Sequence, residues 1–189
     1  MTPSVDARRT RAADAGMWLF LASLVMFYAA LYSGYVLLRA GSETWTTPWL
    51  ARPIVWGIPP LVVSTTLGLA LVFVGIRQWR LAAESGAPRS IGVWLPTMAT
   101  LSLTLTWLDA ARAMLAAGSG PATSVAAASW FVLTGALALG VLGGGLVATW
   151  WAWRDRQSGT PAHALRQLQR YWALMLVVWF SIVIGMYVV

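Results

Sequence analysis

The sequence contains no cysteine and no lysine, and it has few charged residues of either sign. The absence of cysteine excludes disulfides, thiolate metal sites and a cysteine nucleophile. The ionisable side chains are thirteen arginines, six acids, one histidine and five tyrosines. This set offers no Ser–His or Ser–Lys constellation, and no glycine-rich loop lies between a strand and a helix to hold phosphate. The sequence therefore predicts no catalytic residue, which disfavours an independent enzyme or pump.

Charge is scarce because most of the chain is apolar: 59% of the residues are hydrophobic, 10% are charged, and the mean hydropathy is +0.69. Five apolar runs approach the roughly 20 residues that a helix needs to cross a bilayer. Backbone groups in lipid must be paired within the segment, and these runs do not alternate as barrel strands do. The sequence predicts an all-α, polytopic membrane protein with one domain over 1–189 and five transmembrane helices in one bundle, at about 16–38, 54–76, 91–108, 126–153 and 171–189.

Two helix starts carry capping signals. Asp14 stands just before the first apolar run and is expected as the N-cap of that helix. Thr160 and Pro161 form a favourable pair of N-cap and first helical residue. This pair predicts that the last helix begins there, ahead of its apolar run.

The arginines are divided unequally between alternate loops. Three fall on one side of the predicted bundle, and the other ten are Arg8, Arg9, Arg11, Arg77, Arg80, Arg89, Arg154, Arg156, Arg166 and Arg170. Cytoplasmic loops carry the excess of positive charge, so the N-terminus is expected in the cytoplasm and the C-terminus outside. The three on the outer side are Arg39, Arg52 and Arg112. The formal charge of +7 then reflects topology, and no nucleic-acid partner is expected.

Small residues recur at helical spacing in the fourth run. They occupy every fourth position, at Ala136, Gly140, Gly144 and Ala148. Such positions stack on one face and let helix backbones approach closely, which is a main route to helix association in lipid. The first run has a shorter version of the pattern, Ala30 with Gly34. Both stripes are predicted to be helix-packing faces.

The third run is rich in hydroxyl groups. They can bond to a neighbouring helix or back to a carbonyl of their own helix, and back-bonding is the expectation for most of them. Thr100 and Thr104 would line the substrate path if the chain were a transporter. The single histidine, His163, lies in a polar segment beside basic residues, and one imidazole does not make a metal or haem site. No cofactor or metal is therefore expected in this chain.

Three segments share the pattern of one family. GMWLFLASLVMF at 16–27 is similar to GMWLFLASEVMF, WFVLTGALALGVLGG at 130–144 to FYVLTGLHALHVLGG, and YWALMLVVW at 171–179 to YWHFVDVVW. These are motifs of subunit III of the haem-copper cytochrome oxidases, and their order and spacing fit. The chain resembles the short, five-helix bacterial form of that subunit. The resemblance implies a multi-pass protein of the bacterial inner (cytoplasmic) membrane.

The chain departs from the family wherever the motifs carry an ionisable group. Apolar or small residues stand at those positions: Leu24, Leu137, Gly140, Ala173 and Met175. A charge at the centre of a membrane helix costs about 2.5–3.5 kcal/mol unless it has a partner. Losing all of these groups together leaves none unpaired, so the fold should tolerate the loss. A role in proton uptake that depended on them is put in doubt.

The resemblance implies a non-catalytic subunit of a respiratory cytochrome oxidase. Such a subunit packs beside the catalytic subunit I and other subunits, holds phospholipids and stabilises the complex during turnover. Haem and copper are then expected in subunit I. Two alternatives remain open: a stand-alone small membrane transporter or lipid-binding module, and an accessory subunit of a nitric oxide reductase.

Overall fold

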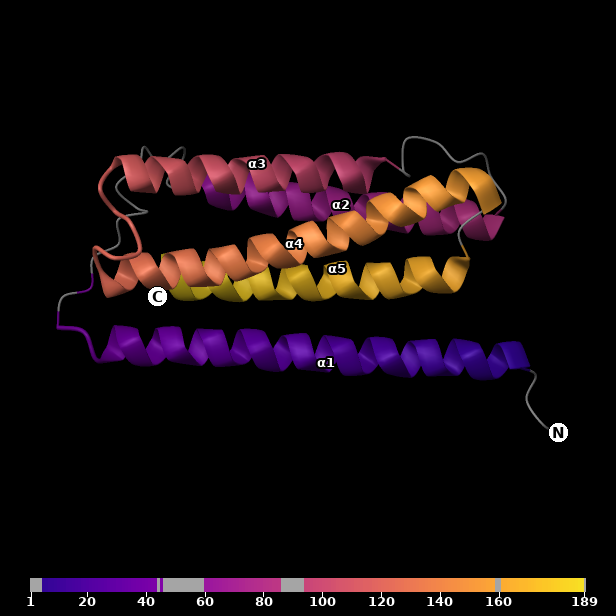
Figure 1. The fold of residues 1–189 in the computed structure, drawn as a ribbon, viewed down its shortest axis with the longest axis horizontal. Coiled ribbons are helices and arrows are strands. Elements are labelled where there is room, and N and C mark those ends of the chain that lie inside the picture. The colour runs from indigo at the N-terminus through magenta and orange to yellow at the C-terminus, as the bar shows by residue number, and fades with distance from the viewer. Residues whose placement is uncertain (1–4, 44, 46–59, 86–93, 159–160, 189) are drawn as a thin grey trace.

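The computed structural model of the protein describes residues 5–43, 45, 60–85, 94–158 and 161–188. These residues form five α-helices and contain no strand (Figure 1). A π-helical turn, Ile184–Val188, continues the last helix. The predicted all-α class is confirmed, and the helices are α1 (Val5–Ala40), α2 (Pro60–Ser85), α3 (Leu95–Ala116), α4 (Val125–Ser158) and α5 (Ala162–Val183).

Most of the predicted helix bounds differ from the observed ones because the helices extend beyond the apolar runs, although α3 begins at Leu95, later than the predicted 91. α1 begins at Val5, so Asp14 lies within the helix and is not its N-cap. α5 begins at Ala162 with Pro161 as its N-cap, which confirms the start predicted from Thr160 and Pro161 and moves the N-cap by one residue. Polar extensions such as VDARRTRAADA are rich in alanine and arginine, which favour helix even where no lipid requires it. Three helices also end later than predicted, at Ser85 in α2, Ala116 in α3 and Ser158 in α4.

Some predicted positions cannot be compared in this way. The first residues of the predicted second and third helices, 54–59 and 91–93, lie outside the described residues, as do Arg52, Arg89 and Thr160.

Four helices are long and apolar enough to cross a membrane among the described residues. Their candidate spans are Thr10–Ala40, Leu61–Ser85, Val125–Asp155 and Ala162–Met186. α3 is not one of them, because its threonines and its two charged residues, Asp109 and Arg112, interrupt the apolar run. The chain is thus an all-helical, multi-pass membrane protein.

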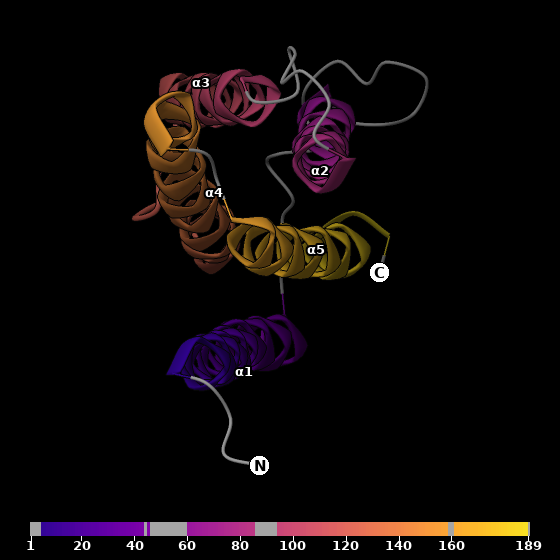
Figure 2. The same ribbon diagram turned by 90° about the vertical axis from the view of Figure 1, so that its right-hand side faces the viewer.

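Helices α2 to α5 form a ring, and α1 lies outside it (Figure 2). Contacts join α2 to α3, α3 to α4, α4 to α5 and α5 back to α2, while α1 contacts α4 and α5. The interior of the ring is filled with large side chains, including the fully buried indoles of Trp79, Trp130, Trp172 and Trp179. In α1 only 17% of the apolar window is buried, against 44% in α5. α1 is therefore the most peripheral of the four candidate spans.

The polar face of α3 is turned toward α4. The Thr97 and Thr149 hydroxyls are 3.1 Å apart, and the Trp107 indole donates to the Thr134 hydroxyl at 3.1 Å. Between these two bonds, Thr100 packs against Gly145 so closely that no Cβ fits there. Most threonines of α3 also bond back to their own helix, as expected: Thr100 to Pro96, Thr104 to Thr100 and Thr106 to Ser102.

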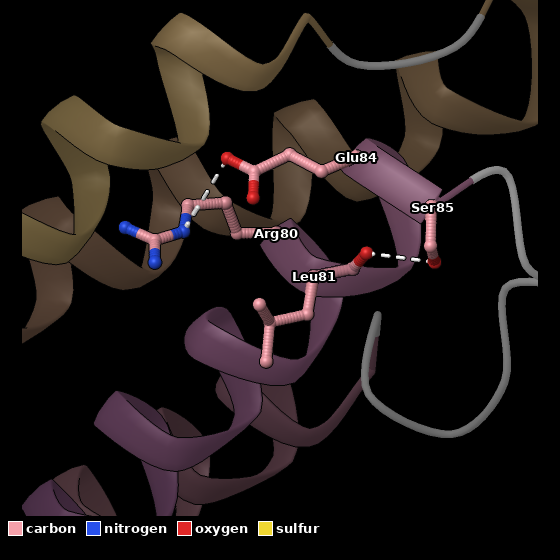
Figure 3. A network of polar contacts seen from close by, with 4 residues as sticks. All are labelled: Arg80, Leu81, Glu84 and Ser85. Atoms are coloured by element: carbon pink, nitrogen blue, oxygen red, sulfur yellow. Dashed lines mark hydrogen bonds and ion pairs between the residues drawn. The ribbon is translucent and has the colours of Figure 1, made fainter.

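α1 begins at one end of the bundle and α5 finishes at the other (Figure 1). The end where α1 begins is here called the arginine-rich end, because α2 and α4 also finish there with their arginines. At the last turn of α2, Arg80 pairs with Glu84 at 3.7 Å and the Ser85 hydroxyl donates to the Leu81 carbonyl at 2.9 Å (Figure 3). These local contacts support the helical extension beyond the apolar run.

Candidate functional site: the junction of α1, α4 and α5

The three segments that carry the family resemblance lie on α1, α4 and α5 and meet in space. The hydroxyl of Tyr28, which directly follows the first segment, donates to the carbonyl oxygen of Ala136 on α4 at 3.0 Å. The Tyr171 hydroxyl, at the start of the third segment, donates to the carbonyl oxygen of Gly140 at 2.5 Å. The ring of Tyr171 also stacks on Phe20 of α1, with centroids 6.2 Å apart. We call this contact region the tyrosine junction.

Gly140 lies at the centre of the tyrosine junction. A Cβ at this position would lie 2.9 Å from the Tyr28 hydroxyl, 3.1 Å from the Met175 sulfur and 3.4 Å from the Tyr171 hydroxyl. The space beside residue 140 is therefore filled by two hydroxyls and a thioether. A larger side chain here would have to displace the atoms that bond α1 and α5 to α4.

The predicted small-residue stripe of α4 runs along the same seam. At Gly144 a Cβ would overlap the ring of Tyr171 and lie 3.0 Å from the Trp172 indole. Ala148 is buried, with 1% of its surface exposed, and Ala136 packs at the edge of the core. The structure therefore brings Gly140 and Gly144 of the α4 stripe against α5. α1 contacts the N-terminal part of the stripe, at Ala136 and Gly140.

The small pair on α1 has a different setting. Ala30 is exposed, and nothing lies within 4 Å of the place where a Cβ of Gly34 would be. Gly34 lines a groove of about 540 Å³ between α1 and the first turns of α4. A packing role for Ala30 and Gly34 toward another chain stays a prediction.

The positions at which the chain lacks the family's ionisable groups are distributed around the junction. Met175 is fully buried and touches the Gly140 position. Leu137 is also buried, and Leu24 is half-buried against the same core. Ala173 is half-buried on α5. The structure thus brings Gly140 and Met175 together, and Leu24 and Leu137 belong to the same hydrophobic core.

Two further polar contacts hold α1 to α5, one at each end. Near the C-terminal end of α5, the Gly185 carbonyl accepts from the Tyr35 hydroxyl at 2.9 Å and from the Arg39 guanidinium at 2.8 Å. At the arginine-rich end, Arg170 pairs with Asp14 at 3.2 Å and lies over the Trp18 ring. Apolar grooves of about 390 Å³ and 370 Å³ lie along α1 between these contacts. α1 is therefore attached at separate points rather than along a continuous seam.

The sequence analysis missed these tyrosines, although a signal was present. Leu21, Tyr28 and Tyr35 are seven residues apart and are the buried residues of α1 between Thr10 and Ala40. Residues at this spacing share one helix face. A phenol in the middle of an apolar run also needs a hydrogen-bond partner when water is excluded. Together these two points would have predicted the face through which α1 packs.

The described residues bring no three His, Asp or Glu side chains together as a metal site would require. His163 lies in the first turn of α5 and is half-buried. The expectation that haem and copper belong to a partner chain stays a prediction.

No family model and no curated protein matches this chain. The fold and the junction define an all-helical, multi-pass membrane protein whose hydrogen-bonded contacts between α1, α4 and α5 are built from tyrosine hydroxyls and helix carbonyls. The family resemblance accordingly rests on the three motif segments and stays an interpretation.

Proposed function

We propose that this chain is a non-catalytic, subunit III-like component of a respiratory haem-copper oxidase. The observation that carries the proposal is the tyrosine junction. Three segments that resemble motifs of one family are separated by up to about 150 residues of chain, yet they meet around Gly140 through the bonds of Tyr28 and Tyr171. A shared packing framework would produce this convergence even where the ionisable groups are gone.

The physical role of such a subunit is packing. Among the described residues, the large apolar side chains facing outward include Trp18, Phe20, Phe27, Leu139 and Leu146. In a bilayer these faces contact either lipid tails or the helices of another subunit. We propose that subunit I and other subunits cover part of this surface and that phospholipids cover the rest. Haem and copper would belong to subunit I.

The proposal includes a membrane topology. α3 would be the fifth span, with its polar face satisfied by α4 through Thr97 and Trp107. The arginine-rich end would face the cytoplasm, which places the N-terminus inside and the C-terminus outside the bacterial inner membrane. Arg11, Arg154 and Arg170 are at this end, whereas Arg39 is at the opposite one.

Affinity purification from native membranes tests the proposal. The tagged chain would be extracted in mild detergent, its partners identified by mass spectrometry, and a reduced-minus-oxidised spectrum recorded. We expect an oxidase subunit I and haem in stoichiometric amounts. A Gly144→Leu variant, which should break the α4–α5 seam, would serve as the control. Partners that bind the folded chain specifically should be lost from this variant.

The alternative functions give different results in the same experiment. A nitric oxide reductase subunit in place of the oxidase subunit would identify the accessory role in that complex. A colourless 20.5 kDa protein without partners would refute the subunit proposal. Thr100→Val with Thr104→Val would then test transport, although both hydroxyls donate to carbonyls of their own helix.

A further inference from the structure

A small cavity lies among helices α2 to α5, and its α4 lining includes Leu137, which adjoins Ala136 of the tyrosine junction. Its volume is about 20 Å³, and residues from all four helices line it. Most of the lining is apolar, but three threonines face it from three different helices: Thr65 of α2, Thr104 of α3 and Thr134 of α4. Thr134 lies nine residues into α4, about 13 Å of helix rise from its start. Leu61, in the first turn of α2, also lines the cavity, which therefore lies in the part of the ring where α2 and α4 begin.

Thr65 differs from the hydroxyl residues beside it. The Ser64 hydroxyl donates to the Leu61 carbonyl at 3.2 Å, and the Thr66 hydroxyl donates to the Val62 carbonyl at 2.7 Å. Thr65 is 8% exposed and makes no hydrogen bond to any described residue, although it lines the cavity. A hydroxyl inside a helix bundle is unfavourable without a hydrogen-bond partner, and lipid offers it none. Thr65 therefore supplies a donor and an acceptor at the cavity wall.

The two threonines on the other walls supply acceptors. The Thr104 hydroxyl donates to the Thr100 carbonyl at 2.9 Å, which leaves the lone pairs of its oxygen available. The Thr134 hydroxyl donates to the Trp130 carbonyl at 2.6 Å and accepts from the Trp107 indole, so one lone pair remains. The Trp179 indole, which also lines the cavity, is already bonded to Thr66 at 2.9 Å.

We propose that this cavity binds one water molecule, which bridges the Thr65 hydroxyl to the hydroxyl oxygens on α3 and α4. About one probe sphere, roughly 10–15 Å³, is enough for a water, and a water needs two to four polar partners. The cavity meets both conditions, and its size excludes a larger organic ligand. A dehydrated cation would need more oxygen ligands than three threonines provide, and no carboxylate lines the cavity. This inference does not depend on the proposed function.

Hydroxyl-radical footprinting tests the water site. The full chain in lipid nanodiscs would be exposed to a short X-ray pulse, and oxidation of each residue would be read by mass spectrometry. Radicals formed from a bound water oxidise the side chains next to it. We expect Leu103 and Leu137, which line the cavity, to be oxidised severalfold more than Leu105 and Leu139, which face the lipid.

Two variants of Thr65 make the result specific. Thr65→Val removes the hydroxyl with little change of volume and should reduce oxidation of Leu103 and Leu137 to the lipid-facing level. Thr65→Ser keeps the hydroxyl and should preserve it. If Thr65→Val fails to fold, Thr104→Val gives the same comparison from the neighbouring helix α3. Wild-type oxidation at the lipid-facing level, or oxidation that persists unchanged in the folded valine variant, would overturn the proposal.

Discussion

The hydroxyl of Tyr171 on α5 donates to the carbonyl oxygen of Gly140 on α4, one helical turn from the carbonyl oxygen of Ala136 that receives the hydroxyl of Tyr28 on α1. A helix carbonyl already accepts a bond within its own helix, and its second lone pair is free for a side chain. The two tyrosines use these lone pairs, so three helices are joined without any charged group. This arrangement leads to the first prediction.

Removing either hydroxyl should weaken the attachment of one helix. We expect Tyr171→Phe and Tyr28→Phe each to lower the free energy of unfolding by about 0.6–2 kcal/mol, the range for interhelical hydrogen bonds in membranes. Unfolding by SDS titration in mixed micelles measures this change. Tyr32→Phe is the matched control, because no hydrogen bond joins the Tyr32 hydroxyl to the described residues. Equal effects of all three substitutions would contradict the assignment.

Gly143 and Gly144 are adjacent but should respond oppositely to the same substitution. In Gly144→Ala the new methyl group meets the rings of Tyr171 and Trp172, so we expect a loss of about 1–3 kcal/mol from overpacking. Nothing lies within 4 Å of a Cβ at Gly143, so Gly143→Ala should be neutral or stabilising by up to about 1 kcal/mol through helix propensity. Thermal unfolding in detergent compares them.

Leucine substitutions at the same two positions test the complex proposed above. Gly144→Leu should prevent close packing of α4 on α5 and reduce the yield of the assembled complex, whereas Gly143→Leu should not. Wild-type complex yield for Gly144→Leu would refute the view that this stripe is a packing face.

Restoring the acid of the first motif should be harmful by itself. Leu24 packs against the apolar core, and neither Leu137 nor Met175 can offer a partner to a carboxylate. Leu24→Glu should therefore lose about 2.5–3.5 kcal/mol, or bind a proton to avoid the charge. Yield from membranes and unfolding midpoint measure the loss, with Leu24→Met as the control of similar volume. A Leu24→Glu variant that is as stable as the control and ionised would contradict the view that a carboxylate at this position needs partners on α4 and α5.

Arg39 should hold the far end of α1 in place. Its guanidinium and the Tyr35 hydroxyl both bond the Gly185 carbonyl, at the end of α5 where helix carbonyls lack partners. Spin labels can be attached at Leu37→Cys and Ile184→Cys, because the chain has no cysteine of its own. We expect Arg39→Met to lengthen the mean distance between these labels and to broaden its distribution. Arg112→Met, at the same end of the bundle, is the control. An unchanged distance distribution in Arg39→Met would show that the bond from Arg39 to Gly185 is not needed to hold α1 in place.

The helical class and the α4 stripe could be predicted because each depends on local patterns. Long apolar runs predict spanning helices, and four small residues at fourfold spacing predict a close-packed face, of which Gly144 lies against Tyr171 and Trp172 and Gly140 against Tyr171 and Met175. The helix ends could not be found this way, because hydropathy marks the lipid-embedded part and not the polar turns beyond it. Asp14 shows the consequence: a favourable N-cap residue lies inside α1 and pairs with Arg170 instead.

The polar contacts were the part that the sequence did not reveal. Tyr28 pairs with a backbone carbonyl, and backbone acceptors exist at every residue, so no complementary partner residue stands out in the sequence. The Thr97–Thr149 and Trp107–Thr134 bonds also depend on the alignment of α3 with α4, which no single run specifies. Hydroxyl-rich runs therefore predict that bonds will form but not between which helices.

The long sequence separations of the α1 contacts have a consequence for biosynthesis. α1 is made first, but its partners for Asp14, Tyr28 and Tyr35 are Arg170, Ala136 and Gly185, which leave the ribosome more than 100 residues later. Until then α1 lacks these contacts, and its largely exposed apolar surface suits it to lipid. The ring of α2 to α5 can close once α5 is inserted, and the contacts of α1 with α5 then complete the bundle. Premature release of the nascent chain before α5 would leave α1 without its anchors at both ends.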